Sequence, residues 1–225
     1  MPPFVTTHTE KAPMAKDARR AQRAAQKRKE RERRLRMERA RRQGKAPELT
    51  RRRLLEMARD LPMRDCVISR GWRERGLAHI LLARTAPDGR LLAAGYYVDL
   101  LCLGLKDTAV LHNLDPEEYE HSIKSNVFND PVELEPCDPG LARAVVEGAI
   151  EFAGRWGLKP NKRWGESRRL LAGIEPAADR IPFGRDGKPC LVLRPGEDLT
   201  GPRRRLERVL GPGNFLIETP GSGGK

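Results

Sequence analysis

The first quarter of the chain carries almost no large apolar side chains. Residues 14–43 contain no Gly or Pro, and between Ala15 and Ala40 only Leu35 and Met37 are large and apolar. Ala, Arg, Lys, Glu and Gln, which are strong helix formers, make up nearly all of the rest. Three glutamates stand four positions before an arginine, a pairing that stabilises a helix by about 0.2–0.5 kcal/mol each: Glu30–Arg34, Glu32–Arg36 and Glu38–Arg42. We therefore predict a basic helical arm over residues 14–45, after a disordered N-terminus over residues 1–13.

Apolar residues become frequent and periodic after residue 46. The stretch 46–61 is typical of a short helix whose inward face is Leu54, Leu55, Ala58 and Leu61. The segment 65–69 is predicted to be a short strand. Two longer apolar runs, 76–86 and 91–104, flank a Pro-Asp-Gly turn and predict a β-hairpin. Because both runs are apolar on both faces, we expect central strands that helices cover.

The second half of the chain alternates helices with short strands. Asp115 is placed to cap a helix that begins at Pro116. Residues 139–156 show the clearest helical periodicity, with one wide apolar face that includes Trp156 and an opposite polar stripe. A hairpin over 181–193 should turn at Asp186-Gly187. The remaining predicted elements are a short helix around 167–172, a basic helix over 201–210, a strand over 214–218 and a disordered tail over 219–225.

These elements define the expected fold. Strands and helices come in runs rather than as βαβ units, so the predicted class is α+β. We expect a small mixed or antiparallel sheet packed with helices over residues 46–218, preceded by the long basic N-terminal helix.

Charge divides the chain at the same place as hydrophobicity. Residues 1–53 hold 19 Lys and Arg against six Asp and Glu, whereas residues 54–225 hold 25 of each, so the first segment accounts for the net charge of +13. Arg outnumbers Lys in the arm, and Arg makes bidentate contacts to phosphate that Lys cannot. The basic side chains expected to contact phosphate are Arg19, Arg20, Arg23, Lys27, Arg28, Lys29, Arg31, Arg33, Arg34, Arg36, Arg39, Arg41 and Arg42.

Several other classes of function lack their sequence signals. The arm has neither a heptad nor an apolar stripe, which argues against a coiled coil and against a membrane surface. No apolar run reaches 18 residues, and no secretory signal precedes the chain, so we expect a cytoplasmic protein with reduced cysteines. The four cysteines form no C-x-x-C pair, and neither a P-loop nor a G-x-G-x-x-G motif is present. We therefore predict no metal and no cofactor.

Two motifs carry a family resemblance. The segment 96–108 contains Cys-Leu-Gly-Leu-Lys-Asp, and the segment 181–189 contains Phe-Gly-Arg-Asp-Gly-Lys-Pro. With residues 148–160 between them, these segments resemble an uncharacterised bacterial protein family built around CLGxKD and FGxDGKP motifs. The resemblance covers about residues 64–193 and leaves the arm outside. That family has no established activity, so the resemblance implies a bacterial domain and nothing catalytic.

Two carboxylates offer an enzymatic alternative. Asp99 lies in an apolar strand and Asp107 follows shortly after it, an order similar to that of metal-dependent nucleases of the ribonuclease H-like kind. Such a site needs further carboxylates, for which Glu147, Glu151 and Asp186 are the candidates. The structural interpretation competes at each position: Asp99 bonds backbone groups or an arginine, the glutamates lie on a solvated helix face, and Asp186 is a turn residue.

Aromatic residues among cations are also ambiguous. Trp72 and Trp164 are each flanked by Arg or Lys, a pattern that can stack bases while the charges hold phosphates. The competing interpretation is a half-buried indole with an arginine over it. His79, between apolar neighbours, is expected to be an interior residue rather than a catalyst.

The charge division favours a non-enzymatic protein that associates with nucleic acid. RNA or the ribosome is favoured over DNA, because no helix-turn-helix or zinc finger accompanies the arm. The alternatives are the nuclease that uses Asp99 and Asp107, and an interaction module whose arm binds an acidic protein partner.

Overall fold

A computed structural model describes residues 49–126, 132–178, 180–194 and 196–219. These residues belong to one compact unit that begins at Leu49. The predicted arm over 14–45 and the segments 1–13 and 220–225 lie outside the described residues.

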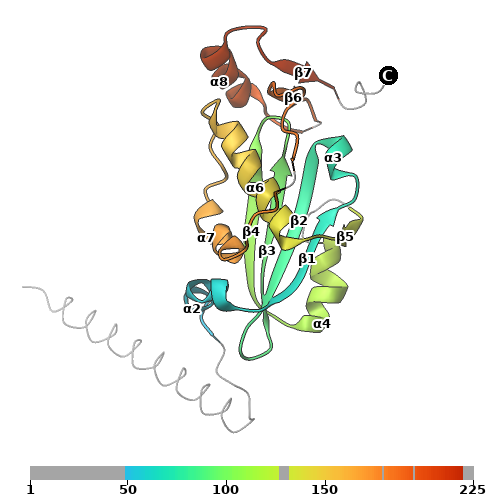
Figure 1. The fold of residues 1–225 in the computed structure, drawn as a ribbon, viewed down its shortest axis with the longest axis vertical. Coiled ribbons are helices and arrows are strands. Elements are labelled where there is room, and N and C mark those ends of the chain that lie inside the picture. The colour runs from blue at the N-terminus through green and yellow to red at the C-terminus, as the bar shows by residue number, and fades with distance from the viewer. Residues whose placement is uncertain (1–48, 127–131, 179, 195, 220–225) are drawn as a thin grey trace, which may run out of the picture. The chain divides into compact units, whose positions relative to one another are not determined.

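A five-stranded antiparallel sheet forms the centre of this unit (Figure 1), in the order β4-β3-β2-β1-β5. The predicted hairpin of two central strands is confirmed: β2 and β3 pair over their whole length, with Ile80 opposite Tyr96. The bounds of the strands are Met63–Ser69 for β1, Leu77–Thr85 for β2, Leu91–Asp99 for β3, Gly104–Leu114 for β4 and Leu134–Pro136 for β5. The predicted α+β class, in its antiparallel form, therefore holds for this part of the chain.

Helices cover one face of the sheet. Figure 1 shows α6 (Pro139–Gly154) lying along β3 and β4, with α7 (Trp164–Leu171) and α2 (Arg51–Glu56) beyond its N-terminal half. The largest apolar cluster fills this layer, and Tyr96, Val145 and Leu170 are fully buried in it. Asp138 caps α6 by accepting from the backbone N of Leu141 at 3.1 Å. The predicted helix over 139–156 is thus confirmed.

A shorter helical segment covers part of the opposite face. It consists of α4 (Pro116–Glu118), the π-helical turn η2 (Tyr119–Ile123) and α5 (Lys124–Asn126). Asp115 caps it through the backbone N of Glu117 at 2.9 Å, as predicted. The Tyr119 ring is buried against a second apolar cluster, and its hydroxyl donates to Asp65 at 3.0 Å.

The predicted helix over 46–61 is present in two pieces. The helix α2 ends at Glu56, and the 3-10 helix η1 (Ala58–Asp60) follows it. The four residues expected to face inward are all buried: Leu54, Leu55, Ala58 and Leu61. The short helix α3 (Trp72–Arg75), which connects β1 to β2, was not predicted.

The C-terminal segment corrects one prediction. We expected a hairpin over 181–193, but only its turn is present: Asp186 and Gly187 both have positive φ, at 51° and 76°, and a single bridge joins Arg185 to Lys188. The strand that follows, β6 (Cys190–Val192), pairs in parallel with β7 (Leu216–Glu218) instead. The helix α8 (Thr200–Leu210) connects the two strands. Pairing with β7 forms three ladder positions, which the short segment before the turn does not offer.

Candidate nucleic-acid interface

The described unit carries a basic surface on α2, η1 and α7. Its two segments, residues 49–61 and 158–171, hold nine Arg and Lys against three Asp and Glu. The helices α2 and α7 are in contact, and Arg51 bridges them by an ion pair of 2.6 Å to Glu166. We call these two segments the α2–α7 surface. It is the place where the chain enters the described unit, since Leu49 packs on the main cluster.

All five cations of the α7 side are available to a ligand. They are exposed and form no ion pair with any other described residue: Lys159, Lys162, Arg163, Arg168 and Arg169. On the α2 side, Arg52 and Arg53 share Glu56 at 2.8 and 3.6 Å. Such exposed pairs are weak in water, at about 0.2–1 kcal/mol, so phosphates can compete for these arginines.

A buried arginine fixes α7 to the sheet. Arg84 on β2 is only 5% exposed, and its guanidinium donates to the carbonyl oxygens of Leu170 at 3.0 Å and Ala172 at 3.2 Å. It also donates to Leu61 at 2.7 Å and Arg59 at 3.3 Å, at the end of η1. Burial lowers the pKa of Arg84. The unpaired carbonyls at helix C-termini carry partial negative charge, which explains why a cation without a carboxylate partner is tolerated here.

The carboxylates of the nuclease alternative do not come together. Asp99 is 2% exposed, and its Oδ1 accepts from the backbone N of Leu101 at 2.9 Å and of Cys102 at 2.8 Å. Its Oδ2 faces Arg194 at 3.4 Å. Asp107 is exposed and accepts from Asn161 at 3.1 Å. Asp99 therefore makes the contacts of a buried turn residue.

The other candidate carboxylates are also held by local structure, in ion pairs or in a turn. Glu147 and Glu151 pair within α6 with Arg143 at 2.9 Å and Arg155 at 3.1 Å, and Asp186 forms the turn. Within the described ranges, no three His, Cys, Asp or Glu side chains are grouped as metal ligands. The geometry thus gives the nuclease alternative no support.

The two motif segments, 96–108 and 181–189, lie side by side. The backbone N of Gly184 donates to Leu100 O at 2.9 Å, and that of Cys190 donates to Leu101 O at 2.9 Å. Gly104 has φ +68°, and a Cβ there would lie 2.9 Å from Ala149 O of α6. The motif residues therefore build a junction between the β3–β4 turn and the C-terminal segment, where glycine is required by conformation and by space.

The tryptophan rings pack against apolar clusters rather than projecting into solvent. Trp72 is 3% exposed, and Arg73 lies 4.1 Å above its ring. Trp164 packs on the main cluster. Trp156 packs on a third apolar cluster, which is formed by Cys102, Leu191, Leu206 and Phe215. The packed interpretation holds for Trp72, and base stacking by these rings gains no support. His79 is buried as expected, stacked on Tyr97 with 4.7 Å between ring centroids.

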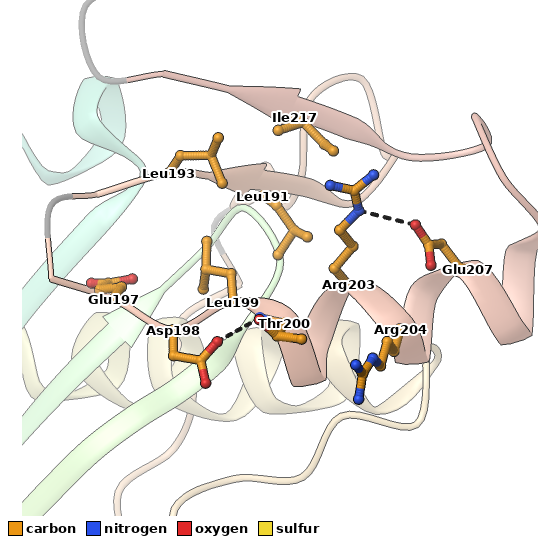
Figure 2. Close-up of a pocket in the computed structure, with 10 residues that line it drawn as sticks. All are labelled: Leu191, Leu193, Glu197, Asp198, Leu199, Thr200, Arg203, Arg204, Glu207 and Ile217. Carbon is orange, nitrogen blue, oxygen red and sulfur yellow. Dashed lines mark hydrogen bonds and ion pairs between the residues drawn. The ribbon is translucent and has the colours of Figure 1, made fainter.

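A cleft of about 540 Å³ lies between α8 and the β6–β7 pair (Figure 2). Its apolar wall includes Leu191 and Ile217, and its acids are already engaged, since Glu197 pairs with Lys106 outside the lining. Figure 2 shows Arg203 bonded to Glu207 at 3.0 Å and Asp198 accepting from the backbone N of Thr200 at 2.9 Å. Because the cations of α8 stand among acids, this cleft is a poorer phosphate site than the α2–α7 surface.

The phosphate contacts predicted for the arm, Arg19 to Arg42, lie outside the described residues. No described helix is long and apolar enough to cross a membrane. No protein-family model, curated protein or solved structure matches this chain, so the resemblance seen in the two motifs stays a prediction.

Proposed function

We propose that this protein is a non-enzymatic binding protein that associates with nucleic acid, with RNA or the ribosome favoured over DNA. The observation that carries the proposal is the charge division, in which residues 1–53 hold a net charge of +13 and residues 54–225 hold none. A balanced domain needs no such segment for solubility. A dense run of arginines offers multiple contacts to a phosphate backbone, which is the main source of affinity for nucleic acid.

The α2–α7 surface offers a second region that can contact nucleic acid. It holds nine Arg and Lys against three Asp and Glu, and its five cations on the α7 side are exposed and form no ion pair with another described residue. The arm directly precedes α2 in the sequence. The one aromatic ring in the segments of the α2–α7 surface, that of Trp164, packs on the main cluster, and we therefore expect contacts to phosphates rather than to bases, with little sequence preference.

Binding to labelled single-stranded RNA and to duplex DNA over a salt series tests the proposal. The first variant replaces the 13 predicted arm cations by Gln in the full chain. We expect weaker binding and a flatter dependence of log K on log salt, by about 0.7 for each lost contact on a single strand. A second variant replaces the 11 arginines among them by Lys, which keeps the charge but removes bidentate contacts.

A matched pair of variants tests the domain. One replaces the five unpaired α7-side cations by Gln, and the control replaces five exposed cations elsewhere: Arg64, Arg180, Lys188, Arg204 and Arg208. Weaker binding of the first variant than of the control is expected. Unchanged affinity of the arm variant would exclude the arm from binding, and capture of an acidic protein that persists after nuclease treatment would support the alternative partner.

The start of the described unit sets where a truncation should be made. Thr50 caps α2 by accepting from the backbone N of Arg53, and Leu49 packs on the main cluster. Removing residues 1–48 leaves these contacts in place, whereas removing residues 1–53 would also destroy the cap. The shorter truncation therefore separates loss of the arm from damage to the domain.

A further inference from the structure

Two cysteines lie opposite each other at the end of the β1–β5 pairing. In this antiparallel pairing Val67 is opposite Pro136, the last residue of β5, and the same register continued by one residue places Cys66 opposite Cys137. The backbone N of Cys137 donates to Cys66 O at 2.9 Å, which extends the hydrogen-bonded pattern of the ladder to these two residues. The Cα atoms of such pairs are about 5.5 Å apart. That separation lies within the range of about 4.4–6.8 Å that a disulfide spans.

The two thiols also interact. The Cys137 thiol is the largest cause of a raised pKa at Cys66, and the Cys66 thiol is the largest cause of a lowered pKa at Cys137. The Cys137 thiol also donates to the backbone oxygen of Asp138 at 3.3 Å. The sequence shows 70 residues between the two cysteines and gave no sign of this pair, because only the position of β5 beside β1 brings them together.

The surroundings of Cys137 act on its pKa in both directions. Burial and the charge of Asp138, the cap of α6, raise it, whereas the backbone of Ala142 in the first part of that helix and the charge of Arg73 lower it. With the Cys66 thiol as the largest cause, the pKa of Cys137 is lowered overall. Helix N-termini and neighbouring cations are the settings in which cysteines become reactive. Cys137 is partly exposed, whereas Cys66 is only 7% exposed.

We propose that Cys66 and Cys137 form a dithiol site that reacts with low-molecular-weight disulfides, with Cys137 as the nucleophile and Cys66 as the resolving thiol. The Cys137 thiolate attacks one sulfur of the disulfide, forms a mixed disulfide and releases the first thiolate. The Cys66 thiol then loses its proton and attacks the Cys137 sulfur, which releases the second thiolate. The protein loses two hydrogens, and the small disulfide is reduced to two thiols.

The other two cysteines serve as an internal control. Cys102 and Cys190 are both fully buried in this structure. Burial raises the pKa of the Cys102 thiol and raises that of Cys190 to about 11. Neither has the thiolate character or the access that the first attack requires. They should stay reduced while the folded protein reacts.

Oxidised glutathione is the test reagent, applied to the folded full-length chain. After the remaining thiols are blocked with an alkylating agent, intact mass and peptide mapping should show one disulfide, between Cys66 and Cys137. The reaction rate should reach half its maximum at a lower pH than that of an ordinary cysteine, because the attacking thiolate forms more readily. Reduction with excess glutathione should restore both thiols.

Two variants separate the roles. Cys66→Ala should stop the reaction at a glutathione adduct on Cys137, whereas Cys137→Ala should give neither adduct nor disulfide. Mapping of the wild-type protein needs no variant and keeps the assignment testable if one fails to fold. A wild-type protein that keeps all four thiols, that forms the bond only after unfolding, or that holds a persistent adduct on Cys137 would overturn the dithiol site.

Discussion

Replacing Arg84 by Met removes a buried cation from the junction of β2, α7 and η1. Its bonds to Leu61 O and Leu170 O are buried, whereas those to Arg59 O and Ala172 O are partly open to water. A hydrogen bond from a charged group stabilises a fold by about 1.5–3 kcal/mol. The two buried bonds therefore amount to about 3–6 kcal/mol, and water can replace the two outer ones.

Part of this loss is offset because the variant no longer buries a guanidinium. Methionine is close to the arginine stem in length, so the change leaves little empty volume. We expect the free energy of unfolding of Arg84→Met to fall by about 3–4 kcal/mol. For a domain of this size, that corresponds to a decrease in Tm of roughly 6–16 °C. Arg84→Lys should lose about half as much, since one ammonium group reaches fewer carbonyls.

Urea unfolding followed by circular dichroism measures both variants, with the m-value as a check on two-state behaviour. Arg64→Met is the matched control, because Arg64 is exposed and its pair with Glu120 is 3.8 Å long. Its effect should stay within about 0.5 kcal/mol. A loss below about 1 kcal/mol for Arg84→Met at an unchanged m-value would refute the role given to the helix-end carbonyls.

Two further predictions concern the junction of the family motifs. Asp99→Asn removes the charge that faces Arg194 at 3.4 Å and weakens the acceptor of the turn, so urea unfolding should show a loss of about 2 kcal/mol; an unchanged midpoint would contradict this role. Gly104→Ala forces a side chain to adopt φ +68° and to press on a carbonyl of α6. We expect a loss of about 2–3 kcal/mol by the same assay, and Gly165→Ala, where a Cβ meets open space, should be neutral or stabilising.

The elements that the sequence predicted best are those that are apolar on both faces, or apolar on one face and polar on the other. Two apolar runs around a Pro-Asp-Gly turn were enough for β2 and β3, and the capped, amphipathic segment after Asp138 was enough for α6. The edge strand β4 was missed because it alternates irregularly between buried and half-exposed positions. The parallel partner of β6 was missed because pairing across a helix leaves no local signal.

The residues of the candidate site could likewise be predicted from the sequence only in part. The sequence placed Asp99 correctly in a strand but could not decide between a metal ligand and a turn, because the deciding groups are backbone nitrogens. An arginine within an apolar strand was the available signal for Arg84, yet its acceptors stand up to 88 residues away in sequence. The α2–α7 surface likewise joins segments that no pattern connects.

The outer strand β4 also limits how this protein can meet a partner. Its register with β3 shifts twice, once near each end, and Asn161 already occupies the backbone oxygen of Leu105 from outside. A flat, regular edge invites a strand of another chain, whereas a bulged and partly occupied one does not. Self-assembly by continuing the sheet is thereby disfavoured at this edge. At this edge, a partner is left to contact side chains, where a change of charge alters binding without altering the sheet.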